Sequence, residues 1–182
     1  MMHNLISHFL TITIHKYRVM RLCFQCGLYK QGILHDLSKY SLIEFIPGVK
    51  YYQGYRSPIS KEKEVKGYSE GWLHHKGRNK HHWEYWIDHT KQGVTPIQMP
   101  IRYVAEMICD RIAASKTYLK DNYHDGAPLQ YFHNEGRYVT MHPNTKQLTQ
   151  HLLEYLQEHG EQNLLSYMKK LIKKHNTSHE KT

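Results

Sequence analysis

The sequence predicts a single all-α domain, and three observations lead to that class. A length of 182 residues, with 40% hydrophobic and 23% charged residues, suits one folded domain with a sizeable core rather than a disordered chain. Apolar residues recur at helical spacing over two long segments, residues 4–26 and 101–120. No internal repeat and no strong linker divides the chain, so we expect one all-helical domain.

Three helices are expected in the first part of the chain: residues 4–26, 28–37 and 41–52. The first can end at Gly27, because glycine is common just after a helix. Ser41 suits the N-cap of the third helix, and Glu44 three residues later completes the sequence of a capping box. End signals therefore support the boundaries that apolar spacing suggests.

The middle of the chain is predicted as short helices between loops. Residues 53–67 contain glycine, serine, proline and many charges, which favours a loop. Two helical pieces are expected after it, residues 68–76 and 80–90, with a Gly-Arg-Asn turn between them. Residues 93–100 form a second predicted loop.

The clearest core helix covers residues 101–120, and Pro100 suits its first turn. Asn144 can cap a further helix over residues 145–158. A last helix is expected over residues 161–174. These helices complete the all-α prediction.

The remaining C-terminal sequence is mixed. A brief extended piece is expected near residues 138–140, and the polar tail from about residue 175 is expected to be frayed. We therefore divide the chain into a metal-binding helical core, residues 1–120, and a C-terminal helical extension of the same domain, residues 121–182.

The chain is strongly basic, with a formal net charge of +9 when histidine is neutral. A basic balance favours anionic partners, which include nucleotides, nucleic acids and phosphoesters. Part of the excess is a C-terminal group of lysines that suits a solvated helix face: Lys169, Lys170, Lys173 and Lys174. The charge thus narrows the class of partner without identifying one.

Cysteine usage and hydropathy bear on location. Three cysteines, an odd number, argue against a disulfide framework and for a reducing compartment. Cys23 and Cys26 form a C-x-x-C sequence within an apolar helical pattern, so we expect them to be small core residues. No apolar run reaches the length of a membrane span, and none is followed by a signal-peptide cleavage site. We expect a cytoplasmic protein without a membrane partner, whose oligomeric state is open.

Histidine is abundant, with 16 copies, and four features with metal-ligand chemistry follow one another along the chain. They are His15, the doublet His35-Asp36, a histidine-rich block over residues 74–82, and Asp110. Imidazole and carboxylate together suit Mn, Fe, Co, Ni or Zn far better than calcium. Asp110 lies in an apolar helix, where an unpaired carboxylate is too costly to bury. The four features together predict one or two divalent transition-metal ions.

This order of residues resembles the HD superfamily of metal-dependent phosphohydrolases. The family pattern is a His on one helix, a His-Asp doublet on the next, optional further histidines, and an Asp on a later helix. The segment from His35 to Lys39, His-Asp-Leu-Ser-Lys, is similar to the family's frequent His-Asp-hydrophobic-Gly-Lys, with Ser38 in place of Gly. The resemblance covers about residues 9–120 and implies an HD-type helical bundle. Residues 75–86 look most like an uncharacterised branch found in bacteria and their viruses.

The resemblance also implies a ligand set. The residues that match the obligatory positions, and would hold one ion, are His15, His35, Asp36 and Asp110. Further histidines in the family often build a second metal site in which the doublet Asp bridges both ions. The candidates for that site are His75, His81 and His82. We prefer His75 to His74, because neighbours on a helix point about 100° apart.

Basic residues near the predicted centre are candidates for substrate contact. Lys39 lies about one turn beyond Asp36 and could supply a positive charge to a substrate oxygen, so Asp36 and Lys39 are the expected catalytic residues. Lys76 and Arg78 lie in the histidine-rich block and could bind a phosphate, a task for which the arginine fork is the better suited.

The resemblance implies a phosphohydrolase that acts on a nucleotide or related phosphoester through metal-activated water. The expected partner is therefore a small phosphorylated molecule, with nucleic acid as the alternative. One competing hypothesis is an HD-fold di-iron oxygenase, which requires the second metal site. Another is a non-catalytic, metal-stabilised binding protein for a nucleotide or nucleic acid, whose binding would depend strongly on salt.

Overall fold

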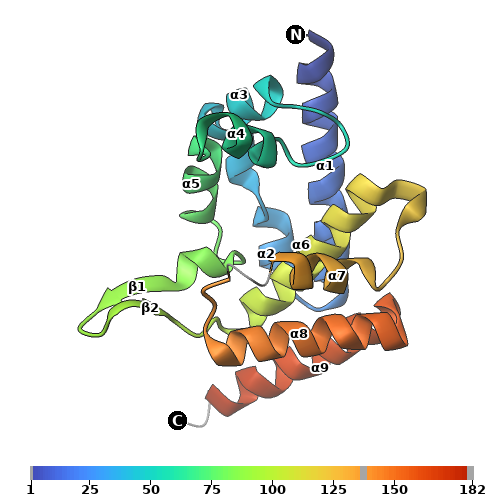
Figure 1. Ribbon diagram of the computed structural model, residues 1–182. Coiled ribbons are helices and arrows are strands. Elements are labelled where there is room, and N and C mark those ends of the chain that lie inside the picture. Colours follow the sequence, from blue (N-terminus) through green and yellow to red (C-terminus); the bar gives the residue numbers. More distant parts are fainter. Residues whose placement is uncertain (1, 136–138, 180–182) are drawn as a thin grey trace.

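The computed structural model describes residues 2–135 and 139–179, and helices dominate them (Figure 1). The α-helices are α1 (Met2–Gln25), α2 (Tyr29–Leu34), α3 (Leu42–Lys50), α4 (Pro58–Lys66), α5 (Glu70–Lys76), α6 (Ile101–Leu119), α7 (Ala127–Glu135), α8 (Pro143–His159) and α9 (Glu161–His179). The shorter elements are the 3-10 helices η1 (Leu37–Tyr40), η2 (Trp83–Trp86) and η3 (Lys120–Asn122), and the strands β1 (Ile87–Thr90) and β2 (Gly93–Pro96). The predicted all-α class is confirmed, with one hairpin added in the described ranges.

The hydrophobic core lies where α1 and α6 pack against each other and against α8 and α9. Val19 of α1 and Ile108 of α6 are completely buried there. The cysteines Cys23, Cys26 and Cys109 are free and buried in the same core. Figure 1 shows α8 and α9 side by side across one end of the molecule, so helices from both halves of the sequence share this core. None of the helices in the described ranges has the length and apolar character that a bilayer span requires.

The prediction of a loop over residues 53–67 was wrong, because α4 occupies most of it. Pro58 is the first residue of this helix, and Gly67 ends it with a left-handed backbone (φ 81°). These are ordinary helix start and stop signals. The charges that suggested a loop stabilise the helix instead, since Lys66 donates to Glu62 one turn away (Nζ to Oε1, 3.0 Å).

The predicted helix over residues 80–90 was also wrong. The chain there forms η2 and then β1, which pairs antiparallel with β2 in the predicted loop that follows. The Trp86 indole donates to the carbonyl oxygen of Lys80 (2.8 Å), which folds the segment back on itself before the hairpin. Gly93 permits the tight return, because its φ of 94° is a conformation that glycine adopts without strain.

The predicted capping box at the start of α3 was wrong. Ser41 occupies the N-cap position, but its side chain makes no capping hydrogen bond. Glu44 points instead to two histidines of α5, with its carboxylate oxygens 2.6 Å from His74 Nδ1 and 2.7 Å from His75 Nδ1. The capping pattern therefore marked the helix start correctly but missed the purpose of the glutamate.

The C-terminal helices differ from the prediction at their ends. α8 begins at Pro143 rather than after Asn144, and His142 caps it by accepting the N–H of Asn144 at Nδ1 (3.2 Å). α9 continues to His179, beyond the predicted start of a frayed tail. The predicted extended piece includes Tyr138, which lies outside the described residues, and the described residues after it form no strand.

Candidate metal centre

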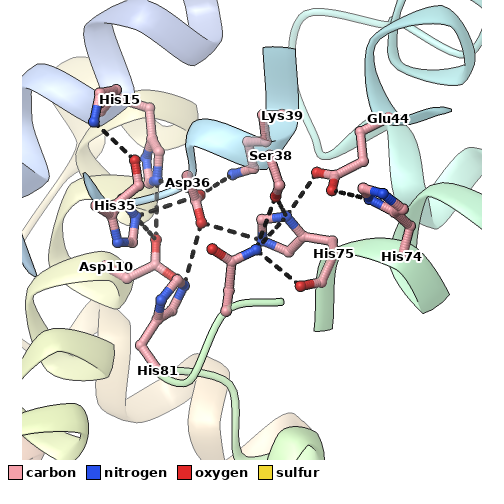
Figure 2. A network of polar contacts seen from close by, with 12 residues as sticks. His15, His35, Asp36, Ser38, Lys39, Glu44, His74, His75, His81 and Asp110 are labelled. Carbon is pink, nitrogen blue, oxygen red and sulfur yellow. Dashed lines mark hydrogen bonds and ion pairs between the residues drawn. The ribbon is translucent and has the colours of Figure 1, made fainter. Parts of the chain in front are cut away.

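The four sequence features meet at one buried point between α1, α5 and α6 (Figure 2). His15 comes from α1 and Asp110 from α6. His35 and Asp36 come from the link between α2 and η1, and the remaining histidines from α5 and from the turn that follows it. Because His75 and His81 approach from the side opposite α1, they face Asp36 across the centre (Figure 2).

One group of ligand atoms gathers around Asp36 Oδ2. His35 Nε2 lies 3.3 Å from that oxygen, and His15 Nε2 lies 3.8 Å from it. Asp110 Oδ1 lies 3.0 Å from His15 Nε2 and 3.8 Å from His35 Nε2. Two imidazoles and two carboxylates therefore converge, with all four ligand atoms within 4.8 Å of one another.

A second group gathers around the other oxygen of the same carboxylate. His75 Nε2 lies 3.2 Å and His81 Nε2 3.4 Å from Asp36 Oδ1, and His82 completes the set. Here too the four ligand atoms lie within 4.8 Å of one another. Asp36 thus belongs to both groups, the arrangement of a carboxylate that bridges two ions.

The would-be ligand atoms make few other interactions. Within the described residues, six of them are buried and form no hydrogen bond: Nε2 of His15, His35, His81 and His82, and both carboxylate oxygens of Asp36, of which Oδ2 has an ion pair with Lys39. A buried polar atom without a partner costs about 1–3 kcal/mol. Six at one point would be a large penalty if no ligand were bound. The nitrogen and oxygen donors fit divalent transition metals, which would satisfy these atoms directly.

Asp36 has an unusual backbone conformation. Its φ of 53° and ψ of 25° are left-handed, which only a small share of non-glycine residues adopt. This turn ends the second predicted helix early, because the chain leaves α2 at Leu34 and restarts as η1. It also directs the Asp36 carboxylate inward, where 1% of the residue is exposed. Such strain is typical of functional sites.

Glu106, one turn before Asp110 on α6, orients two of the ligands. Its Oε1 accepts from Nδ1 of His35 (3.0 Å) and lies 3.2 Å from Nδ1 of His81. The opposite ring nitrogens, Nε2, then face Asp36. Burial disfavours the charged carboxylate, but the two histidines outweigh it and lower the pKa of Glu106 to about 2. A glutamate that stays ionised is a strong partner for metal-bound imidazoles.

Glu44 performs the same task for His75. Its Oε2 lies 2.7 Å from His75 Nδ1, while Ser38 Oγ and Asn79 Nδ2 both lie 3.2 Å from that nitrogen. His74 contacts the other oxygen of Glu44 and stays outside the centre. The structure therefore directs His75, rather than His74, at Asp36.

The acidic and basic groups of the centre shift one another's pKa values. Burial alone would raise the pKa of the Asp36 and Asp110 carboxyls, but the surrounding histidines hold both pKa values well below their usual range, Lys39 adding to the effect at Asp36. Burial alone would lower the pKa of His35, yet the Asp36 carboxylate leads the groups that raise it to about 10. Burial and the neighbouring histidines lower the pKa of His82, which favours the neutral ring a metal requires.

The predicted basic residues differ in their positions. Lys39 lies at the centre, with Nζ 2.5 Å from Asp36 Oδ2. Arg78 is exposed, follows α5 by two residues and donates to the carbonyl oxygen of His74 near the end of that helix (3.4 Å). Lys76 is the last residue of α5 and half-buried. The expected roles of Lys76 and Arg78 in phosphate binding stay predictions.

Two residues of the centre were missed in the sequence, Glu44 and Glu106. Glu106 had a signal, because it is a second acid four residues before Asp110 in the same apolar helix, and it is buried there. Glu44 had no such signal in the sequence, since its spacing from Ser41 matches a capping box.

Comparison with known proteins identifies a family whose function is unknown. Residues 4–155, which include every residue of the centre, match the family described as "Family of unknown function (DUF5662)". No curated protein and no solved structure matches the chain.

Proposed function

Because the chain belongs to the DUF5662 family, whose function is unknown, we propose a function from the geometry of the metal centre: the protein is a metal-dependent phosphoester hydrolase on an HD-type helical bundle. The observation that carries this proposal is the position of Asp36, whose two buried oxygens each face a separate set of histidines. The matching order of His15, His35-Asp36 and Asp110 along the chain supports the likeness to the HD superfamily.

The residues divide between two ions that share Asp36. One ion would be held by His15, His35, Asp36 and Asp110, and the other by Asp36, His75, His81 and His82. Divalent ions bound there supply Lewis-acid chemistry, lowering the pKa of water and neutralising charge on a phosphoryl group. Glu106 and Glu44 keep the imidazoles oriented, so that the ligand atoms are preorganised.

Lys39 is the residue best suited to a substrate phosphate. Its pKa is raised above the ordinary lysine range, since the Asp36 and Asp110 carboxylates outweigh burial, and the amine therefore stays cationic at neutral pH. One-quarter of its side chain is exposed, so it can contact a substrate oxygen as well as Asp36. A fixed positive charge beside the reacting group stabilises charge that develops in the transition state.

A groove that shares Tyr118 with the cavity next to Lys39 offers room for the rest of a substrate. A cavity of about 70 Å³ next to Lys39 is also lined by Tyr118, and Tyr118 forms one wall of an open groove of about 570 Å³. Tyr52 and Tyr55 line that groove together with Asn122. Tyrosine rings stack on nucleobases and amides bind base edges, which favours a nucleotide as the phosphoester.

The test is turnover by metal-loaded protein. Chain freed of metal and reloaded with Mn²⁺, Co²⁺ or Ni²⁺ is incubated with mononucleotides, cyclic nucleotides and a generic phosphodiester, and product is measured. Asp36→Ala is the inactive control, and Asp88→Ala, a change on the exposed strand β1, is the matched active control. Turnover that matches the Asp36→Ala background for every substrate would overturn the proposal.

The paired ligand groups also favour a second candidate, a di-iron oxygenase, because two ions close enough to share a carboxylate can act together on oxygen. Metal analysis of protein grown without added metal separates the two functions. Two irons per chain with oxygen consumption would support the oxygenase. One or two non-iron ions with phosphoester turnover would support the hydrolase.

A further inference from the structure

A second buried histidine of α1 lies outside both ligand groups of the metal centre. His8 is about two turns before His15 on the buried face of the helix, and 6% of the residue is exposed. Its Nδ1 is buried and forms no hydrogen bond with any described residue. A buried polar atom without a partner lowers stability, so a histidine in this position requires an explanation.

Neighbouring residues fix the position of the His8 ring. Phe45 of α3 packs against it with the ring centroids 5.3 Å apart, and Tyr52 lies edge-on to it at 5.9 Å. Gly48 leaves space for the ring on the α3 side, because a Cβ there would lie 2.2 Å from Nε2. The imidazole is therefore held in one place, as a preorganised binding group is.

The His8 ring lines the cavity of about 70 Å³ that also contacts Lys39 and Tyr118. This volume exceeds the roughly 30 Å³ that one water molecule occupies in the liquid, so the cavity has room for a group of several atoms. Thr11, in the wall of the cavity, is hydrogen-bonded to Tyr52, in the wall of the groove (hydroxyl oxygens 2.9 Å apart). The cavity thus adjoins residues of both the proposed phosphate site and the proposed base site.

The charges around the cavity limit the chemistry that it accepts. Glu44 and Glu62 line it; burial alone would raise the pKa of both carboxyls, but their hydrogen-bond partners lower it, so both are ionised at neutral pH. Two carboxylates beside the cation of Lys39 disfavour a bound anion. A bound cation is also disfavoured, since burial and the charge of Lys39 lower the pKa of His8 to about 4. A neutral imidazole has one donor and one acceptor nitrogen, and a neutral hydroxyl group matches either of them.

We propose that His8 binds a sugar hydroxyl of a nucleotide whose phosphate lies at the metal centre and Lys39 and whose base lies in the groove. This inference rests on the proposed function and deepens it, because it makes the substrate a nucleotide with a free ribose hydroxyl rather than any phosphoester. Ile12, Pro47 and Ile59 line the same cavity and supply apolar contacts for the sugar carbons. A ligand without the hydroxyl would leave the imidazole unpaired, which makes such a site selective.

The test is the binding of ligands that cannot be hydrolysed, so that its result does not depend on turnover. Ribonucleoside 5′-phosphonates, in which a methylene group replaces the ester oxygen, and their 2′,3′-dideoxy counterparts are titrated into Mn²⁺-loaded protein in a calorimeter. Wild type should bind the dideoxy series about tenfold more weakly, because those ligands lack the hydrogen bond and leave His8 unpaired. In His8→Leu the two series should bind within about twofold of each other.

Two further variants serve as controls. His3→Leu, the same substitution at an exposed position of α1, should keep the preference of about tenfold for the ribose series. His8→Asn retains a polar group near the place of Nδ1 and should recover part of that preference. Melting of the ligand-free protein separates binding from packing: His8→Leu loses an unpartnered nitrogen, so its melting temperature should equal or exceed that of wild type.

Equal binding of the two series to wild type would overturn the inference, as would wild type that binds neither. A preference for the ribose series that His8→Leu retains has the same consequence, and so does a ligand-free His8→Leu that melts well below wild type, because the ring would then serve packing. Phosphoester turnover without a hydroxyl preference would remove this inference and leave the hydrolase proposal standing. The expected binding pattern without turnover of any substrate would do the reverse.

Discussion

Glu106→Gln is the most informative single change at the metal centre. The substitution keeps the size and shape of the side chain but removes its charge and one acceptor oxygen. Wild-type Glu106 has three partners: His35 Nδ1 and His81 Nδ1 at Oε1, and Gln31 Nε2 at Oε2 (2.9 Å). Glutamine offers a single acceptor oxygen, so at least one of these donors faces an amide NH₂ in the variant.

The structure sets the size and the pattern of the expected loss. Removing a carboxylate that orients a metal-bound histidine typically lowers metal affinity by about 10–100-fold, or roughly 1.4–2.7 kcal/mol. His35 belongs to one ligand group and His81 to the other. Glu106→Gln should therefore lower the affinity of the centre for both ions by that factor. Glu44→Gln, which affects His75 alone among the ligands, should weaken only the second ion.

Metal titrations against a chelator of known affinity measure both ions in each variant, and Co²⁺ absorption reports the ligand set. The reasoning fails if Glu106→Gln binds both ions as tightly as wild type. It fails equally if the loss is confined to one ion, because Glu106 would then not serve both groups.

Four further outcomes are expected. Asp36→Ala should lose both ions, whereas Asp110→Ala should retain the second ion. Metal analysis after gel filtration measures the ions that each variant retains. Equal loss in both variants would contradict an Asp36 that both ions share. Metal uptake at neutral pH should release protons, and metal affinity should rise with pH, because the pKa of His35 is raised to about 10 in the metal-free chain and the ion needs a neutral ring. Calorimetry in two buffers of different ionisation enthalpy counts the released protons. Metal uptake without proton release would refute this expectation. Gly48→Ala should destabilise the fold by about 1–3 kcal/mol, because the new Cβ would lie 2.2 Å from Nε2 of buried His8; an unchanged melting temperature would contradict it. Chelation should lower the melting temperature, and added Mn²⁺ at 100 times its Kd should restore about 2.7 kcal/mol; a melting curve indifferent to metal would argue against a structural contribution.

The residues that meet at the candidate metal centre could be predicted from sequence because their chemistry is discrete. A histidine or aspartate in an apolar helix needs a partner, and the order of the candidates along the chain limits which partners meet. His82 is among the ligands that the sequence predicts, but the backbone around it and the hairpin after it could not be predicted in this way. Side chains of the turn, such as Trp86 bound to the carbonyl of Lys80, determine the backbone there, and they have no periodicity to detect. In α4 the helix start and stop signals, Pro58 and Gly67, are present, but the glycine, serine, proline and charged residues of this segment are typical of loops as well.

The reach of the metal centre along the chain has a consequence for the lifetime of the protein in a cell. Its candidate ligands come from α1, the α2–η1 link, α5, the turn after it and α6, so that bound ions would act as cross-links between segments that are distant in sequence. Without ions, the same point holds buried ring nitrogens of four histidines that form no hydrogen bond within the described residues. Under the proposed function, metal supply would therefore set the fraction of chains that are open to proteases, since ligand binding and unfolding are linked by mass action. Scarcity of the ion would reduce the amount of the protein as well as its activity.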